Sequence, residues 1–211
     1  MEKEIFFYSS GYKIKGTVCL PDEISVNRKV PVIVYSHGYG SSRDGFGDFV
    51  LISEKLKEIE VASLRFDMRG CGFSNYPLGK MLCGTDWKQD LISAVSFISS
   101  YPGINPDKVG VIGASIGGAN VIQAAAEDNR IKCVIALSPI ADGYDWIKKN
   151  WIENHGKDAF NNFLEDIKED KIRSTIYGNS NLMKITYGLS YKQRYTELIE
   201  KMSKSLQDRI F

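Results

Sequence analysis

The sequence has few of the residues that build metal sites, and it has no long hydrophobic run. Its 211 residues include only two histidines, and none of its four cysteines forms a Cys-x-x-Cys pair. Because zinc sites use closely spaced histidines and cysteines, we expect no metal ion and reduced thiols. No segment approaches the roughly 18 apolar residues that a membrane-spanning helix requires. We therefore expect no membrane association.

An excess of either charge is also missing. The chain has 27 basic and 26 acidic residues, a formal net charge of +1, and no basic cluster. Nucleic acids and anionic membranes select clustered Lys and Arg, so we expect neither as a partner. The first residues, MEKEIFFYSS, are too acidic and too briefly apolar for a signal peptide. The expected location is the cytoplasm.

Strand-like and helix-like segments alternate along most of the chain. Residues 5–19 contain two β-prone runs around a Ser-Gly pair, which predicts an antiparallel hairpin. Buried-strand patterns then alternate with amphipathic helical patterns, the strands at 30–35, 61–67, 108–113 and 131–138, and the helices at 49–59, 87–101 and 115–128. This alternation predicts an α/β fold, a doubly wound and mostly parallel sheet with helices on both faces.

The composition changes after Pro139. No further proline and no β-branched run follows, and the remaining segments have helical periodicity, at 144–155, 158–172 and 191–210. We therefore divide the chain into a core of residues 1–139 and a helical, cap-like segment of residues 140–211.

A candidate nucleophile lies where the third buried strand meets a helix. The run from Gly113 to Gly117, GASIG, matches Gly-x-Ser-x-Gly around Ser115. This pattern is typical of a sharp strand-to-helix turn that lifts the serine oxygen clear of a sheet. Small residues two positions before and after the serine avoid collisions in such a turn. The glycine spacing does not fit a dinucleotide-binding turn, and no lysine follows as in a P-loop, so we expect no cofactor.

Two more motifs follow the first two predicted parallel strands, SHGYGSS at 36–42 and FDMRGCGFS at 66–74. With the serine turn, they make the chain resemble the α/β-hydrolase superfamily over roughly residues 4–140, most closely its esterase and serine-peptidase-like branch. The resemblance implies that Ser115 attacks a carbonyl carbon and that the backbone N–H groups of Tyr39 and Ile116 form the oxyanion hole.

The resemblance also assigns structural roles to residues of these motifs. It gives His37 the task of bracing the oxyanion segment, because the family's catalytic histidine follows both the nucleophile and the acid in the chain. Asp67 and Arg69 are expected to shape the second motif, with the arginine in a two-pronged pair with a carboxylate.

The later histidine is His155, which is the candidate base, with Asp142 or Asp145 as the candidate acid. His155 precedes a glycine at the predicted end of a helix. A histidine there also interacts favourably with the helix C-terminus and needs no catalytic role. Both interpretations stay open at this stage.

Members of the family continue the sheet with two further strands that bring the acid and the histidine, whereas this sequence ends at Phe211 after the helical segment. The strand at 131–137 would then be an apolar edge, which natural sheets avoid or cover. We expect that the helical segment covers this edge, that a second copy or another chain completes it, or that the sequence is a fragment.

The sequence therefore favours a serine hydrolase that cleaves a carboxylic ester, a thioester or a small amide through an acyl-enzyme. Its partner would be a small-molecule acyl substrate. We expect weak activity from a truncated chain. The alternative is a non-catalytic binding or interaction module derived from a truncated hydrolase.

Overall fold

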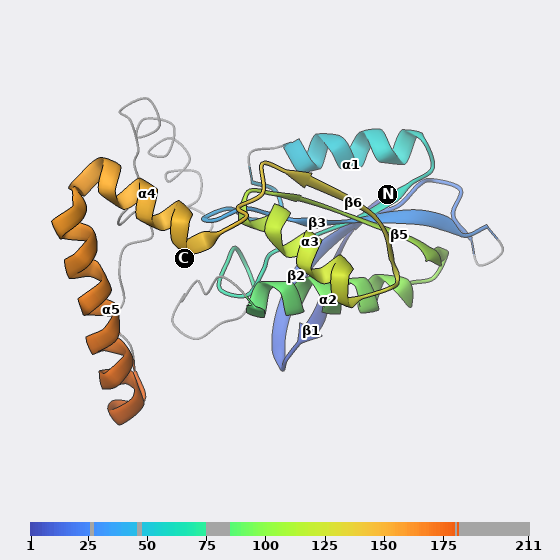
Figure 1. The fold of residues 1–211 in the computed structure, drawn as a ribbon. Helices are drawn as coiled ribbons and strands as arrows, with labels where there is room; N and C mark the ends of the chain where they lie inside the picture. The colour runs from blue at the N-terminus through green and yellow to red at the C-terminus, as the bar shows by residue number, and fades with distance from the viewer. Residues whose placement is uncertain (26–27, 46–47, 75–84, 180, 182–211) are drawn as a thin grey trace. The chain divides into compact units, whose positions relative to one another are not determined.

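The structure, a computed structural model, describes residues 1–25, 28–45, 48–74, 85–179 and 181. Its strands form one mixed sheet in the order β1-β2-β4-β3-β5-β6 (Figure 1). Strands β4, β3, β5 and β6 are parallel, whereas β1 and β2 form an antiparallel hairpin that joins the sheet beside β4. The strands are β1 (Glu2–Ser9), β2 (Tyr12–Cys19), β3 (Val30–Ser36), β4 (Ala62–Phe66), β5 (Ile104–Ala114) and β6 (Ile131–Leu137).

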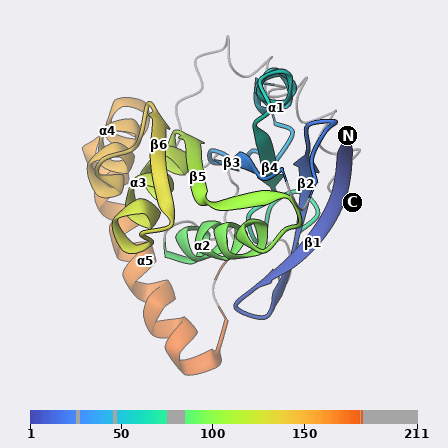
Figure 2. The same ribbon diagram turned by 90° about the vertical axis from the view of Figure 1, so that its right-hand side faces the viewer.

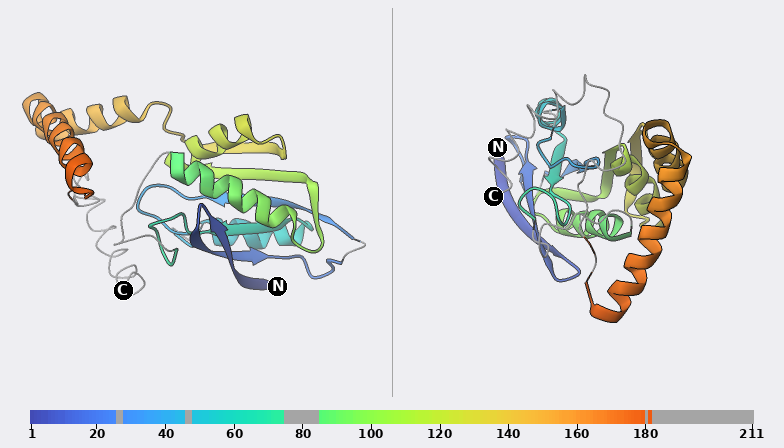
Figure 3. Two further views of the ribbon diagram at one scale, coloured as in Figure 1. Left: turned by 90° about the horizontal axis from the view of Figure 1, so that it is seen from below. Right: turned by 90° about the vertical axis from the view of Figure 1, so that its left-hand side faces the viewer.

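Helices lie on both faces of this sheet. Helix α1 (Asp48–Glu58) packs on one face, and α2 (Thr85–Ser99) and α3 (Ile116–Glu127) lie side by side on the other (Figures 2 and 3). Each helix connects two parallel strands. The predicted doubly wound α/β fold is therefore confirmed.

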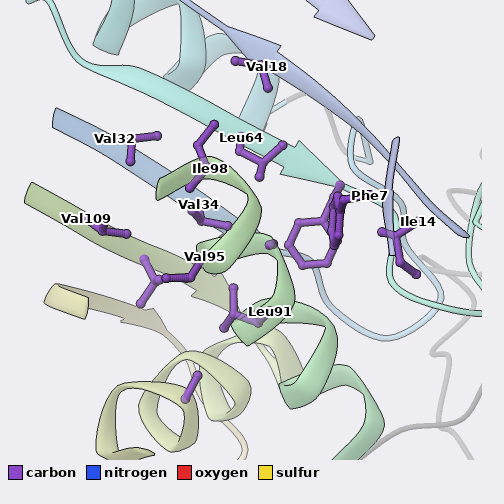
Figure 4. Close-up of a cluster of buried hydrophobic side chains, with 14 of the residues drawn as sticks. Phe7, Ile14, Val18, Val32, Val34, Leu64, Leu91, Val95, Ile98 and Val109 are labelled. Carbon is purple, nitrogen blue, oxygen red and sulfur yellow. The ribbon is translucent and has the colours of Figure 1, made fainter. Parts of the chain in front are cut away.

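The larger core lies between the sheet and α2. Leu91, Val95 and Ile98 project from α2 onto the central strands and are fully buried (Figure 4). Their spacing of four and three residues is that of one helical face. The sheet side of this core is built from side chains of β1 to β5, among them Phe7, Ile14, Val18, Val32, Val34, Leu64 and Val109. A smaller cluster under α1 contains Tyr35, Phe49 and Ile112.

Strand β5 begins four residues earlier than the pattern at 108–113 predicts. Its first part pairs Ile104 with Val30 across a register shift, although residues 105–108 are exposed or half-buried. The pairing of Ile104 with Val30 defines this extension, and the pattern of buried side chains does not reveal it.

Strand β6 is the last strand of the described sheet and pairs only with β5. Val134, Ile135 and Leu137 are 39%, 43% and 44% exposed. Among the residues that the structure describes, the predicted apolar edge is thus present.

The chain divides into two compact units, Met1–Ile140 and Ala141–Phe211. The described part of the second unit is a helical pair, α4 (Gly143–His155) and α5 (Lys157–Tyr177), joined at Gly156. Trp151 of α4 stacks on Phe163 of α5 with ring centroids 3.7 Å apart, beside the buried Phe160. The helix predicted at 191–210 lies outside the described residues. None of the described helices is long and apolar enough to span a membrane.

Candidate functional site

Ser115 occupies a strained turn between β5 and α3. Its backbone has φ 57° and ψ −121°, and a positive φ is uncommon for a residue other than glycine. Its N–H donates to the carbonyl of Leu137 at 2.9 Å, and its own carbonyl accepts from the N–H of Gly118 at 3.0 Å. These bonds hold the serine at the end of the sheet, half-exposed. Backbone strain of this kind is concentrated at functional sites.

The two flanking glycines are required by the backbone that surrounds them. A Cβ atom on Gly113 would lie 2.1 Å from the carbonyl oxygen of Gly117, and one on Gly117 would lie 2.1 Å from the carbonyl oxygen of Ser36. Both obstacles are backbone atoms, which cannot move aside as a side chain can. The steric role predicted for these glycines is therefore confirmed.

The segment His37–Arg43 begins against the serine turn. It is called the oxyanion loop here because the sequence led us to expect an oxyanion donor in it. Strands β3 and β5 are neighbours, and Ser36 pairs with Gly113 in their register. An added Cβ atom on Gly38 would lie 3.4 Å from the Cβ atom of Ser115. The structure thus brings the start of this loop, next to Tyr39, together with Ser115 and Ile116.

His37 is buried behind this loop, with 1% of its surface exposed. Its Nδ1 atom donates to the carbonyl of Gly38 at 2.9 Å, and its Nε2 atom accepts from the N–H of Met68 at 3.1 Å. Burial lowers the pKa of the imidazole below its usual range. With both nitrogens occupied, the neutral ring has none left to accept a proton from Ser115. The expected bracing role agrees with this geometry.

The charged residues of the second motif form buried ion pairs. Arg69 binds Asp90 of α2, with Nη2 2.6 Å from Oδ1 and Nε 3.1 Å from Oδ2, as expected of a two-pronged carboxylate pair. Asp67 accepts from Arg43 Nη1 at 2.6 Å. The partners Arg43 and Asp90 were not predicted from the sequence. For Asp90 a signal existed, since it is a lone carboxylate three residues after Trp87 in an otherwise apolar stripe.

The candidate base and acid lie at opposite ends of α4. The carboxylate of Asp142 caps the helix by accepting from the N–H of Asp145 at 2.9 Å, whereas His155 is in the last turn, 5.7 Å from the ring of Trp151. They are 13 positions apart along the helix, a distance of about 20 Å. The helix therefore does not bring Asp142 to the imidazole of His155, and the same holds for Asp145, which lies in the first turn.

Within the described residues, no cluster of three or more His, Cys, Asp or Glu side chains is arranged to hold a metal ion.

Known proteins share both the sequence and the fold. A model of the X-Pro dipeptidyl-peptidase (S15) family matches residues 10–204, most of the chain. The chain belongs to this family. The quorum-quenching protein AidA of Acinetobacter baumannii is 32% identical over 114 residues, which are 54% of this chain and 37% of that protein. Three curated relatives, AidA included, are each matched over only 37–40% of their length.

Two solved structures align with this member of the S15 family. The α/β hydrolase GrgF from Penicillium has a TM-score of 0.71 at 18% identity, over 98% of this chain and 67% of its own, and supports the fold alone. Est1E from Butyrivibrio proteoclasticus, solved with ferulic acid, has a TM-score of 0.61 at 27% identity, over 69% of this chain and 56% of its own. The predicted membership in the α/β-hydrolase superfamily is confirmed, and with it hydrolase character at the family level.

Proposed function

We propose that the protein is a serine hydrolase that cleaves a carboxylic ester, a thioester or a small amide through an acyl-enzyme on Ser115. The observation that carries this proposal is the strained, half-exposed turn at Ser115 with the oxyanion loop against it. A structural serine has no need of a positive φ held by two obligatory glycines. The match to a peptidase family supports a hydrolytic reaction, because peptidases are hydrolases.

In the proposed reaction, the Ser115 oxygen attacks the carbonyl carbon while its proton passes to a base. The N–H groups of Tyr39 and Ile116 bind the negative oxygen of the tetrahedral intermediate, and each such donor lowers the barrier by about 3 kcal/mol. The bond to the leaving group then breaks, the leaving group departs with its electron pair, and the acyl group stays on Ser115. Water releases the acid in a second step.

Proton transfer from Ser115 is expected to limit the rate, because no histidine is placed to accept the proton. His37 is occupied at both nitrogens, and His155 is the other histidine of the sequence. A triad serine without its partners keeps a residual rate about 10³–10⁴-fold above that in water, owing to the oxyanion hole and substrate binding. An activated ester should then acylate Ser115, and the acyl-enzyme should persist, because deacylation also needs a base.

We expect p-nitrophenyl acetate to place one acetyl group on the protein and to release one equivalent of p-nitrophenolate, after which the reaction nearly stops. Intact mass and peptide mapping would locate the acetyl group on Ser115. Ser115→Ala should remove it, and Ser96→Ala, on the exposed side of α2, should not. An acetyl group that stays in Ser115→Ala, or that maps to another residue, would refute the assignment.

The same experiment tests His155. The imidazole lies in the last turn of α4 beside the ring of Trp151, a position that a structural role explains. We therefore expect His155→Gln to leave both the burst and the slow phase unchanged. Continuous turnover in the original chain that is lost in His155→Gln would instead identify this histidine as the base.

The second candidate function, an interaction module, is favoured by the exposed β6 edge. We propose that a second copy pairs with this strand, whose only charged residue is Lys132. Size-exclusion chromatography with light scattering should then show self-association that decreases in Val134→Lys, because a charge on an edge strand opposes strand pairing. Lys55→Arg, at an exposed position of α1, is a surface control that should not alter it. A clean monomer of the unsubstituted chain would count against this candidate.

A further inference from the structure

Both ends of the oxyanion loop are fastened to two consecutive residues that follow β4. At the start of the loop, the His37 ring accepts from the N–H of Met68. At its end, the backbone N–H of Arg43 donates to Oδ1 of Asp67 at 2.7 Å, and the guanidinium donates to Oδ2 at 2.6 Å. Tyr39, whose N–H is the proposed oxyanion donor, lies between these two anchors.

The Asp67 carboxylate is fixed from several sides and is sealed from water. Its side chain is 1% exposed. It also accepts from the N–H of Phe73 at 3.0 Å, and the backbone N–H of Asp67 donates to the carbonyl of Lys15 in β2 at 2.9 Å. An added Cβ atom on Gly72 would lie 2.4 Å from the carboxyl carbon. The anchor is therefore set by the sheet and by the following loop.

The arginine is equally confined. The Arg43 guanidinium donates from Nε to the Thr17 hydroxyl at 3.2 Å and lies over the ring of Phe73, 5.6 Å from its centroid. The side chain is 7% exposed. A charge-assisted pair with this many fixed contacts defines one position for the end of the loop.

The middle of the loop needs such an anchor. It contains Gly38 and Gly40, the latter with φ 67°, and the internal backbone bond from Ser41 N–H to the Gly38 carbonyl is 3.3 Å long. Glycines leave a backbone many alternative conformations. Displacement of a reacting or stabilising group by about 1 Å costs on the order of 100-fold in rate.

We propose that Asp67 and Arg43 are positioning residues that hold the Tyr39 N–H where the oxyanion forms, a role that rests on the function proposed for Ser115. Neither side chain touches the reacting atoms. They act through the backbone of the oxyanion loop, and the ion pair fixes its far end as His37 fixes its near end.

The acetylation burst separates this role from simple stabilisation. In Asp67→Asn, an amide oxygen can still accept from the Arg43 N–H, but the charge opposite the guanidinium is lost. We expect the first-order acylation rate constant to fall about 10- to 100-fold, while the half-saturating ester concentration and the burst amplitude change less than twofold. A merely structural role would lower the amplitude, which counts folded protein, and leave the rate constant unchanged.

Further variants test the pair itself. Arg43→Lys keeps the charge and should retain more of the rate constant than Arg43→Met. The Arg43 guanidinium also contacts the carboxylates of Glu4 and Asp44, so it keeps anionic partners in Asp67→Asn. The double variant Asp67→Asn/Arg43→Met should lose much less rate than the product of the two single losses, because both substitutions break the same ion pair. Asp90→Asn is the matched control, since it breaks the similarly buried pair with Arg69 outside the oxyanion loop. The acylation rate constant of Asp90→Asn should stay within twofold of that of the unsubstituted protein. A loss as large as that of Asp67→Asn would overturn the proposal.

Amide hydrogen exchange provides a readout that is independent of Ser115 chemistry. Asp67→Asn should accelerate exchange at residues 38–42 relative to Asp90→Asn, and unchanged exchange there would refute the positioning role. If the unsubstituted protein exchanges as expected but gains no acetyl group on Ser115, the proposed hydrolase function fails while the anchoring of the loop stands.

Discussion

Gly117→Ala should destabilise the core unit by about 3 kcal/mol or more, because the new methyl group meets rigid backbone. Its Cβ atom would lie 2.1 Å from the carbonyl oxygen of Ser36 and 2.5 Å from that of His37. Core overpacking ordinarily costs about 1–3 kcal/mol when side chains can rearrange. Here the end of β3 itself would have to move away from α3. Urea denaturation followed by circular dichroism would measure the loss.

Gly38→Ala is the matched control for this prediction. It adds the same methyl group at another glycine beside the serine turn. The nearest atoms to this methyl group, the Ala114 carbonyl oxygen and the Ser115 Cβ atom, are 3.4 Å away, an ordinary contact distance. We expect its free energy of unfolding to change by less than about 1 kcal/mol. Equal losses of stability in the two variants would mean that the short distance to the β3 backbone is not the reason why position 117 requires glycine.

Most strands and helices of the core were predictable because they bury a continuous face. Strand β6 was predictable from its apolar run, although most of its residues are exposed. The apolar run 30–35 indicates a buried strand, and the spacing of Leu91, Val95 and Ile98 indicates a helix. The alternation of such strands and helices along the chain predicts the parallel topology. The first four residues of β5 were not predictable in this way. Ile104 pairs with Val30 across a register shift, whereas residues 105–107 are exposed or half-buried and leave no periodic trace in the sequence.

The candidate site was predictable only in part, for a related reason. Ser115 and its glycines are marked by local sterics, so a five-residue pattern contains the information. The Arg43–Asp67 pair joins residues 24 positions apart. Asp67 was expected to shape the second motif, but Arg43 looks like an ordinary polar loop residue until the fold brings the two together. His155 shows the converse. It is a histidine that follows the serine and an aspartate in the chain, as a catalytic base would. The structure nevertheless places the candidate acid Asp142 at the opposite end of α4 from His155.

The buried His37 leads to a prediction of acid sensitivity. Burial lowers the pKa of its imidazole in the folded chain, although the nearby carboxylates of Asp67 and Asp90 and the bond to the Gly38 carbonyl act in the opposite direction. Protonation would also place a proton on Nε2 against the N–H of Met68. In the unfolded chain the ring is free and takes up a proton at about pH 6.5.

Below about pH 6.5 the unfolded state therefore binds one proton that the folded state excludes, and stability falls as the pH falls, by up to about 1.4 kcal/mol per pH unit until the folded pKa is reached. Above this pH the contribution of His37 is constant. Urea denaturation at intervals between pH 7.5 and 5 would give the free energy of unfolding at each pH. We expect this free energy to fall more steeply with falling pH in the unsubstituted chain than in His37→Gln. His37→Gln removes two hydrogen bonds and lowers stability at every pH, but its slope should be shallower, whereas His155→Gln should keep the steep one. Parallel slopes for the original chain and His37→Gln would show that the folded ring accepts the proton, and that the Met68 bond does not hold it neutral.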